Sequence, residues 1–438
     1  MLIPYRSKFD PETQGEGSID PLGLMPAADR LADWILPGLT ARMWRPRFLT
    51  AIAAMSVITE PFREEIAKDG VSPPWLVMEW YYVEAMANIR AENGINSNRI
   101  PGIDKARQAV ADKVPLSSGR YLKTAKVFGY HGVYKRLGKY LDVVNEDFGL
   151  GESGYRLLCI WEKEQGLSGF CDQTATNGQG AKIRQLLRDA LRDAMASGQT
   201  SRSGGWAGYD FFRESLGPFR FGAQEAEFFR QLFAGDGAAP HHEVFALLRD
   251  PKIRNNFFDD QDERSLIGKL RPKMSGSLGQ RCDAIEALEG VCRPLQEAFD
   301  LLRFVSTRRG ASLIRPQDLK VEDRFCEIAS ELPLNVARAR AALSDSPAAT
   351  EFDNLATRFQ EIRVPEELFS ALWEHHVAVQ KRKPPDGKKR PWFEQTSDGG
   401  LLVRPPYRLE RFNKRDRYVH PYRLSSVVYF LDDLFGSN

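Results

Sequence analysis

Cations interleaved with aromatic rings are the most chemically suggestive feature of this 438-residue chain, and they gather between residues 381 and 423. The segment holds 13 Lys and Arg against 5 Asp and Glu, so its local charge is +8 and the remainder carries −6. Cations neutralise phosphates, and rings stack on unpaired bases. We therefore expect nucleic-acid contacts from Lys381, Arg382, Lys383, Lys388, Lys389, Arg390, Trp392, Arg404, Arg408 and Arg415. The alternative is a solvated charge run that keeps a small domain in solution.

A second cationic group lies on a predicted helix over residues 129–141. Its apolar face is formed by Val133, Leu137, Tyr140 and Leu141. A helix that packs one apolar face on its neighbours leaves the opposite face for a partner. The side chains expected to contact nucleic acid here are His131, Tyr134, Lys135, Arg136 and Lys139.

The elements around this helix follow a recognisable order. The pattern predicts helices over 103–114 and 118–125, then the basic helix, a short strand at 143–144, a turn over 145–151 and a helix from residue 153. This order, with the run Leu150 to Leu158 after the turn, resembles MarR-like winged helix-turn-helix domains over residues 100–165. The resemblance implies a third helix that enters the major groove of DNA. Glu146 and Asp147 depart from it, because wings that touch DNA are usually basic.

Candidate catalytic and metal sites are weaker. His375-His376 and His241-His242 are adjacent pairs, which point about 100° apart on a helix, whereas a shared ion needs ligands at i and i+4. The acidic run 259–263 suits the N-terminus of a helix, where carboxylates meet the helix dipole. We expect no catalytic residue, no metal ligand and no cofactor. The alternative is a metal-dependent nuclease that uses the acidic run or the segment 374–376.

Bulk composition indicates an ordinary globular protein, with 42% hydrophobic and 27% charged residues. The first residues lack the layout of a secretion signal, and the apolar run 48–58 is shorter than the roughly 20 residues that span a bilayer. Five widely spaced cysteines without a CxxC pair favour reduced thiols. We expect a cytoplasmic protein with no membrane partner.

Apolar periodicity predicts a mainly α, multidomain fold with an embedded winged helix and a small basic α+β module at the C-terminal end. Helices are expected over 48–63, 75–91, 183–195, 285–302, 352–362 and 366–380, with a kink or break at Pro294. Strands are expected at 401–403 and 425–431. The expected domains are residues 1–99, 100–171, 172–345 and 346–438.

The overall texture of the chain resembles proteins encoded in bacterial anti-phage defence islands, on the segments SIDPLGL, PRFLTAIA, KKRPWF, RPPYR and HPYR. The resemblance implies a helper subunit that acts beside an ATPase, helicase or nuclease. We expect a non-enzymatic DNA-binding or scaffold subunit, with DNA and other proteins of the complex as partners. A protein-only adaptor remains the other alternative to the nuclease.

Overall fold

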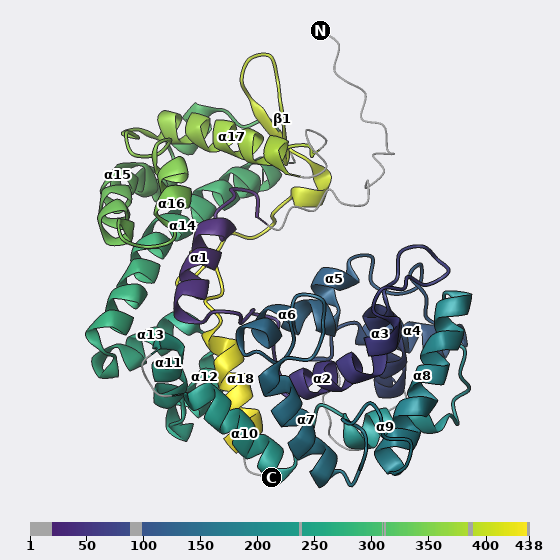
Figure 1. The fold of residues 1–438 in the computed structure, drawn as a ribbon. Helices are drawn as coiled ribbons and strands as arrows, with labels where there is room; N and C mark the ends of the chain where they lie inside the picture. Colours follow the sequence, from purple (N-terminus) through teal and green to yellow (C-terminus); the bar gives the residue numbers. More distant parts are fainter. Residues whose placement is uncertain are drawn as a thin grey trace. The chain divides into compact units, whose positions relative to one another are not determined.

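The computed structural model describes residues 20–87, 99–235, 239–308, 310, 312–383 and 389–435. Within them the chain forms 18 α-helices and one antiparallel sheet of two strands, so the predicted mainly α fold is confirmed (Figure 1). Contacts divide the chain into two compact units. Unit 1 comprises Met1–Ile35 and Asp262–Tyr422, and unit 2 comprises Leu36–Gln261 and Arg423–Asn438. These boundaries differ from the four consecutive domains expected, because both units combine segments that are distant in sequence.

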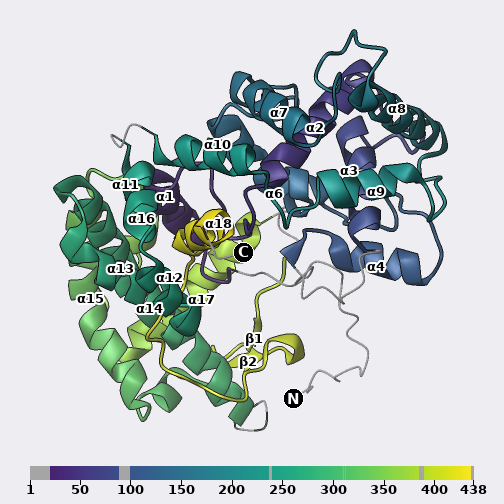
Figure 2. The ribbon, with the colours of Figure 1, turned by 90° about the horizontal axis from the view of Figure 1, so that it is seen from below.

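Unit 2 is built around two helices that are buried on every side. They are α2 (Phe48–Thr59) and α3 (Pro74–Ala87), and they are apolar all round, as a fully buried helix must be. Helices α6, α7 and α8 pack on α2, while α4 and α9 pack on α3 (Figure 2). The remaining helices of this unit are α4 (Ile103–Ala111), α5 (Ala125–Phe128), α6 (Tyr130–Tyr140), α7 (Glu152–Glu164), α8 (Gln179–Ser197), α9 (Ala207–Ser215), α10 (Ala223–Ala234), α11 (Pro240–Leu248), α12 (Pro251–Asp260) and α18 (Leu424–Phe435).

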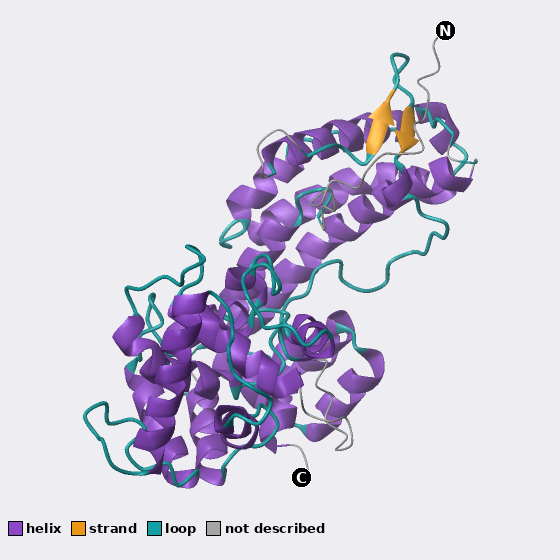
Figure 3. Ribbon diagram, turned by 90° about the vertical axis from the view of Figure 1, so that its right-hand side faces the viewer, coloured by secondary structure: helices purple, strands orange, loops and turns teal. Residues whose placement is uncertain are grey.

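Unit 1 is organised by the 33-residue helix α14 (Gly276–Arg308), which packs along α15 (Asp323–Leu343) and α1 (Met25–Ile35). The two strands, β1 (Phe393–Gln395) and β2 (Leu401–Val403), pair with Phe393 opposite Val403, and β2 lies against α14 (Figure 3). The other helices of this unit are α13 (Glu263–Leu270), α16 (Ala349–Ala356) and α17 (Pro365–Arg382), and short 3-10 turns occur at Arg271–Lys273, Pro316–Leu319 and Pro405–Tyr407.

Four local predictions are wrong. Helix α14 continues through Pro294 without a break. Residues 118–124 form turns, because Ser117 pairs with Gln199 in an isolated bridge instead of starting a helix. The predicted strand 425–431 belongs to α18, which is buried along most of its length. The helix predicted over 352–362 ends as α16 at Ala356, and Phe359 and Ile362 are buried beyond it.

The predicted buried helices at 48–63 and 75–91 are confirmed as α2 and α3, as is the strand at 401–403. Trp80, Tyr81 and Tyr82 lie in the core with no exposed surface. Among the described residues, no helix has the length and apolar character needed to cross a membrane.

Candidate nucleic-acid interface

Residues 408–422, here called the strap, run antiparallel to α14. The backbone N–H of Leu409 donates to Thr307 Oγ1 (3.0 Å), that of Arg415 to Glu297 Oε1 (2.8 Å) and that of Val419 to Glu289 Oε2 (2.8 Å). The anchors on α14 therefore move toward its N-terminus as the strap proceeds. Because backbone groups carry these bonds, the strap is held without using its cationic side chains.

The anchor side chains form an acidic stripe along α14 at Glu286, Glu289, Glu297 and Asp300. Glu289 is fully buried and accepts hydrogen bonds from the backbone N–H groups of Val419 and His420, from His420 Nδ1 (2.9 Å) and from the Tyr422 hydroxyl (2.9 Å). Burial first, and then the neighbouring Glu289 charge, hold the pKa of Tyr422 well above its usual value. The stripe and the strap thus form one closed hydrogen-bonded layer.

Four cations on the strap point away from this layer. They recur at every third residue, and all four side chains are exposed: Arg408, Arg411, Lys414 and Arg417. None of the four forms an ion pair with another residue that the structure describes. By contrast, Arg415 pairs with Asp300 (2.8 Å) and is committed to the stripe. Of these four, only Arg408 was among the residues predicted to contact nucleic acid; the three-residue spacing was the signal that would have found the others.

The predicted stacking residues near the sheet are internal, which corrects their assignment. Trp392 is 9% exposed and stacks on Tyr407, with ring centroids 4.4 Å apart and planes at 4°. Arg303 covers the Trp392 ring at 5.1 Å, and Arg404 is 3% exposed. The rings and the guanidinium bind each other, so Trp392 and Arg404 are not available to a nucleic acid.

The end of α17 presents two further exposed cations, Lys381 and Arg382, which form no ion pair with described residues. Lys383 is half-buried and donates to the Asp20 carbonyl. Lys389 is half-buried and Arg390 is exposed. Lys388 lies outside the described residues.

On α6, two of the predicted contacts belong to the core. His131 is 1% exposed, and Glu79 accepts hydrogen bonds from its backbone N–H (3.1 Å) and its Nδ1 (2.8 Å). Tyr134 is fully buried, and its hydroxyl accepts from the backbone N–H groups of Trp44 and Arg45. Neither side chain can reach a ligand outside the core, so both assignments are corrected.

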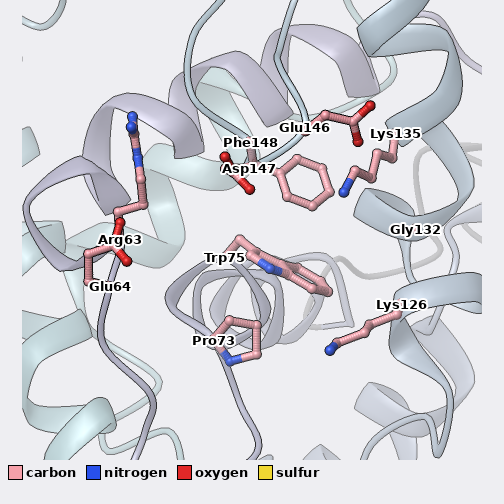
Figure 4. Close-up of a pocket in the computed structure, with 10 residues that line it drawn as sticks. All are labelled: Arg63, Glu64, Pro73, Trp75, Lys126, Gly132, Lys135, Glu146, Asp147 and Phe148. Carbon is pink, nitrogen blue, oxygen red and sulfur yellow. The ribbon is translucent and has the colours of Figure 1, made fainter.

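The acidic turn that follows α6 folds back onto its basic side chains. Lys139 pairs with Glu146, and the Lys135 ammonium lies 4.8 Å from the centre of the Phe148 ring (Figure 4). Arg136 is exposed. Helix α6 packs on α2, α3 and α5, while α4 packs on α3. The turn therefore covers part of the helix face that was expected to contact DNA.

The adjacent histidines of α17 are internal hydrogen-bonding groups. His376 Nδ1 donates to the Pro21 carbonyl (2.8 Å), and its Nε2 accepts from the Trp392 backbone N–H (2.8 Å). His375 Nε2 donates to the Leu22 carbonyl (2.7 Å), and its buried Nδ1 makes no hydrogen bond with any described residue. Both rings fit only as neutral imidazoles. Burial lowers the pKa of each to about 4, and Arg358 and Arg382 near His375 and Lys383 near His376 act in the same direction.

These two histidines predict acid sensitivity of unit 1. Their pKa is about 4 in the folded protein and near 6.5 when unfolded, so the unfolded chain takes up protons first. Their contribution to stability is complete above pH 6.5 and is lost as the pH falls toward 4, at roughly 3 kcal/mol for each ring. The urea midpoint should therefore be lower at pH 5 than at pH 7.5, and the difference should be smaller in His375→Gln. An unchanged pH dependence in this variant would contradict the assignment.

The acidic run before α13 is partly a helix cap, as predicted. Asp262 accepts a hydrogen bond from the backbone N–H of Arg264 (3.0 Å) at the start of that helix. Glu263 accepts from the backbone N–H of Tyr422. Across the described residues, no group of three or more His, Cys, Asp or Glu side chains is placed to hold a metal ion.

Comparisons with known proteins do not add to this geometry. No family model, curated protein or solved structure gave a significant match to the chain.

Proposed function

We propose that the protein is a non-enzymatic nucleic-acid-binding subunit and that the strap is its contact surface. The observation that carries the proposal is the row Arg408, Arg411, Lys414 and Arg417, exposed, without ion pairs among described residues, on a backbone anchored to α14. Such a row meets a line of phosphates without reading base sequence. Lys381 and Arg382 at the end of α17 are further candidates on the same unit.

The strap is a stronger candidate than the winged-helix-like region. On α6, Lys139 is paired, Lys135 lies over an aromatic ring, and His131 and Tyr134 are buried. A recognition helix needs several free side chains that reach base edges. The proposal therefore places affinity in the strap and expects little sequence preference.

The test is the variant in which Arg408, Arg411, Lys414 and Arg417 are all replaced by alanine. Binding of fluorescent duplex and single-stranded DNA is followed by anisotropy from low to physiological salt. Each lost phosphate contact lowers the slope of log K against log salt by about 0.9 on duplex DNA. We expect the slope to fall by about 3 and the affinity at low salt to fall by about two orders of magnitude.

Two control variants locate the effect. Arg338→Ala with Arg358→Ala removes exposed cations that pair with no described residue elsewhere on unit 1, and it should leave the slope unchanged. Replacement of Lys135, Arg136 and Lys139 by alanine tests α6 directly. A strap variant that keeps the wild-type slope would overturn the proposal, and a loss confined to the α6 variant would restore the recognition-helix hypothesis.

The place of this protein in an anti-phage defence complex is a proposal that rests on the sequence resemblance alone. A protein-only adaptor would use the same cations against an acidic protein surface. Co-purification with the products of neighbouring genes, before and after nuclease treatment, separates the two. Partners retained after nuclease, with no DNA affinity of the pure protein, would favour the adaptor.

A further inference from the structure

A cavity of about 330 Å³ opens on unit 2 between α3, the α5–α6 pair and the turn after α6 (Figure 4). It lies at the lower end of the roughly 300–1,000 Å³ typical of small-molecule sites. Two aromatic rings, two lysines and the backbone of Gly132 line one part of it. Its residues are separate from the strap, so a ligand in this cavity is independent of the proposed function.

The aromatic wall is fixed in place. The Trp75 and Phe148 ring centroids lie 5.2 Å apart, and the Trp75 ring lies 5.3 Å from that of His131, which Glu79 holds from behind. Phe148 has a φ of +59°, a left-handed conformation that is uncommon for a bulky residue. The Asn145 side chain stabilises this turn by accepting from the backbone N–H groups of Asp147 and Gly149. A partly exposed indole is therefore presented as a rigid flat surface.

Two ammonium groups converge on this wall. Lys126 of α5 and Lys135 of α6 both direct their side chains toward the Trp75 and Phe148 rings in Figure 4. Gly132 allows this approach, because a Cβ there would lie 2.5 Å from the carbonyl group of Lys126. Lys126 is exposed and forms no ion pair with any described residue.

The acidic residues of the cavity are placed differently. Glu146 is paired with Lys139, which neutralises it. Glu64 and Arg63 lie on the far side of Trp75 from the two lysines, and the Asp147 carboxylate is directed between Arg63 and Trp75 (Figure 4). The cavity is therefore divided into a cationic side, an aromatic wall and an acidic side.

We propose that this cavity binds a phosphorylated planar base. The base stacks on Trp75, Lys126 and Lys135 contact the phosphate, and Asp147 accepts from an exocyclic amine. Stacking of a base on an aromatic side chain contributes about 1–3 kcal/mol, and flexible lysines suit phosphate as point charges. The base can come from a free nucleotide or from one unit of a single strand, which share this chemistry.

The experiment is calorimetric titration of the full chain with adenosine 5′-monophosphate, adenosine, inorganic phosphate and a short oligodeoxyadenylate. It is carried out in the background that lacks the four strap cations, so that strap binding does not contribute. Replacing Lys126 and Lys135 with alanine should weaken the monophosphate at least tenfold and leave adenosine within twofold. Trp75→Leu should weaken both. Lys105→Ala, at an exposed lysine of α4 that pairs with no described residue, is the matched control and should change neither.

The outcomes separate the sources of the base. Comparable affinity for the monophosphate and the oligonucleotide identifies a free-nucleotide site, whereas binding of the oligonucleotide alone, lost in the double lysine variant, identifies a strand site. No binding of either probe overturns the proposal, as does binding that the double lysine variant retains. Thermal melting by circular dichroism shows whether each variant is folded, and Lys126→Ala alone, at an exposed position, keeps the test valid if Trp75→Leu unfolds.

Discussion

Replacement of Glu289 by alanine is expected to lower the free energy of unfolding of unit 1 by about 4 kcal/mol. The carboxylate is fully buried on α14 and accepts four hydrogen bonds from the strap. Its removal leaves the donors of Val419, His420 and Tyr422 without acceptors in a place that water does not reach. Each buried unsatisfied group costs about 1–3 kcal/mol, and relaxation of the strap recovers part of the sum.

Urea unfolding followed by circular dichroism measures this loss. Glu286→Ala, three positions earlier on the same helix, is the matched control. Its side chain is 45% exposed, so its bonds to Tyr418 and the nearby arginines are replaced by water at a cost of about 1 kcal/mol or less. Equal urea midpoints for the two variants would show that the strap is not held by Glu289.

The same substitution tests how the strap contributes to binding. A strap that is no longer anchored must be ordered when a ligand binds, and that ordering reduces affinity. Glu289→Ala should therefore weaken DNA binding without changing the salt slope, because all four exposed cations remain. The strap variant should change both. The two results together distinguish the loss of charge from the loss of a fixed position.

The sequence identified the right region of unit 1 but not the right side chains. Basic residues mixed with Trp and Tyr are typical of nucleic-acid surfaces, yet the same types also pack together inside a protein. Trp392, Tyr407 and Arg404 form such an internal cluster. The choice between these outcomes depends on α14, which is distant in sequence and whose acidic stripe fixes the strap's orientation. Local composition contains no information about that partner.

Apolar periodicity predicted most helices because burial on one face is a local property. It failed where tertiary packing decides. The residues at 425–431 are β-branched and aromatic, which favours a strand, but their burial on several sides in α18 stabilises a helix. Likewise, the apolar face of α6 meets α2 and α3, which lie outside the segment 100–165 that resembles a winged helix. Non-contiguous units cannot be found from composition shifts along the chain.

Replacement of Arg47 by methionine is expected to lower the free energy of unfolding of unit 2 by about 3–5 kcal/mol. The guanidinium is 2% exposed and donates to both oxygens of the fully buried Glu225 (3.2 Å each), to the Gly217 carbonyl (2.6 Å) and to the Ser215 carbonyl (3.1 Å). Its loss leaves Glu225 charged and buried, with the Thr50 hydroxyl (2.6 Å) as one remaining donor.

A double-mutant cycle separates the charge pair from the rest of this network. Arg47→Met with Glu225→Met removes both charges, so the double variant should be less destabilised than the sum of the single variants by about 2 kcal/mol or more. The exposed pair Arg192 and Asp189 on α8, with side chains 59% and 49% exposed, is the control, and its coupling should be below about 1 kcal/mol. Additive effects at Arg47 and Glu225 would contradict a desolvated ion pair. Strong coupling would show that this single buried pair ties α10 to the start of α2, the central helix on which α6, α7 and α8 pack.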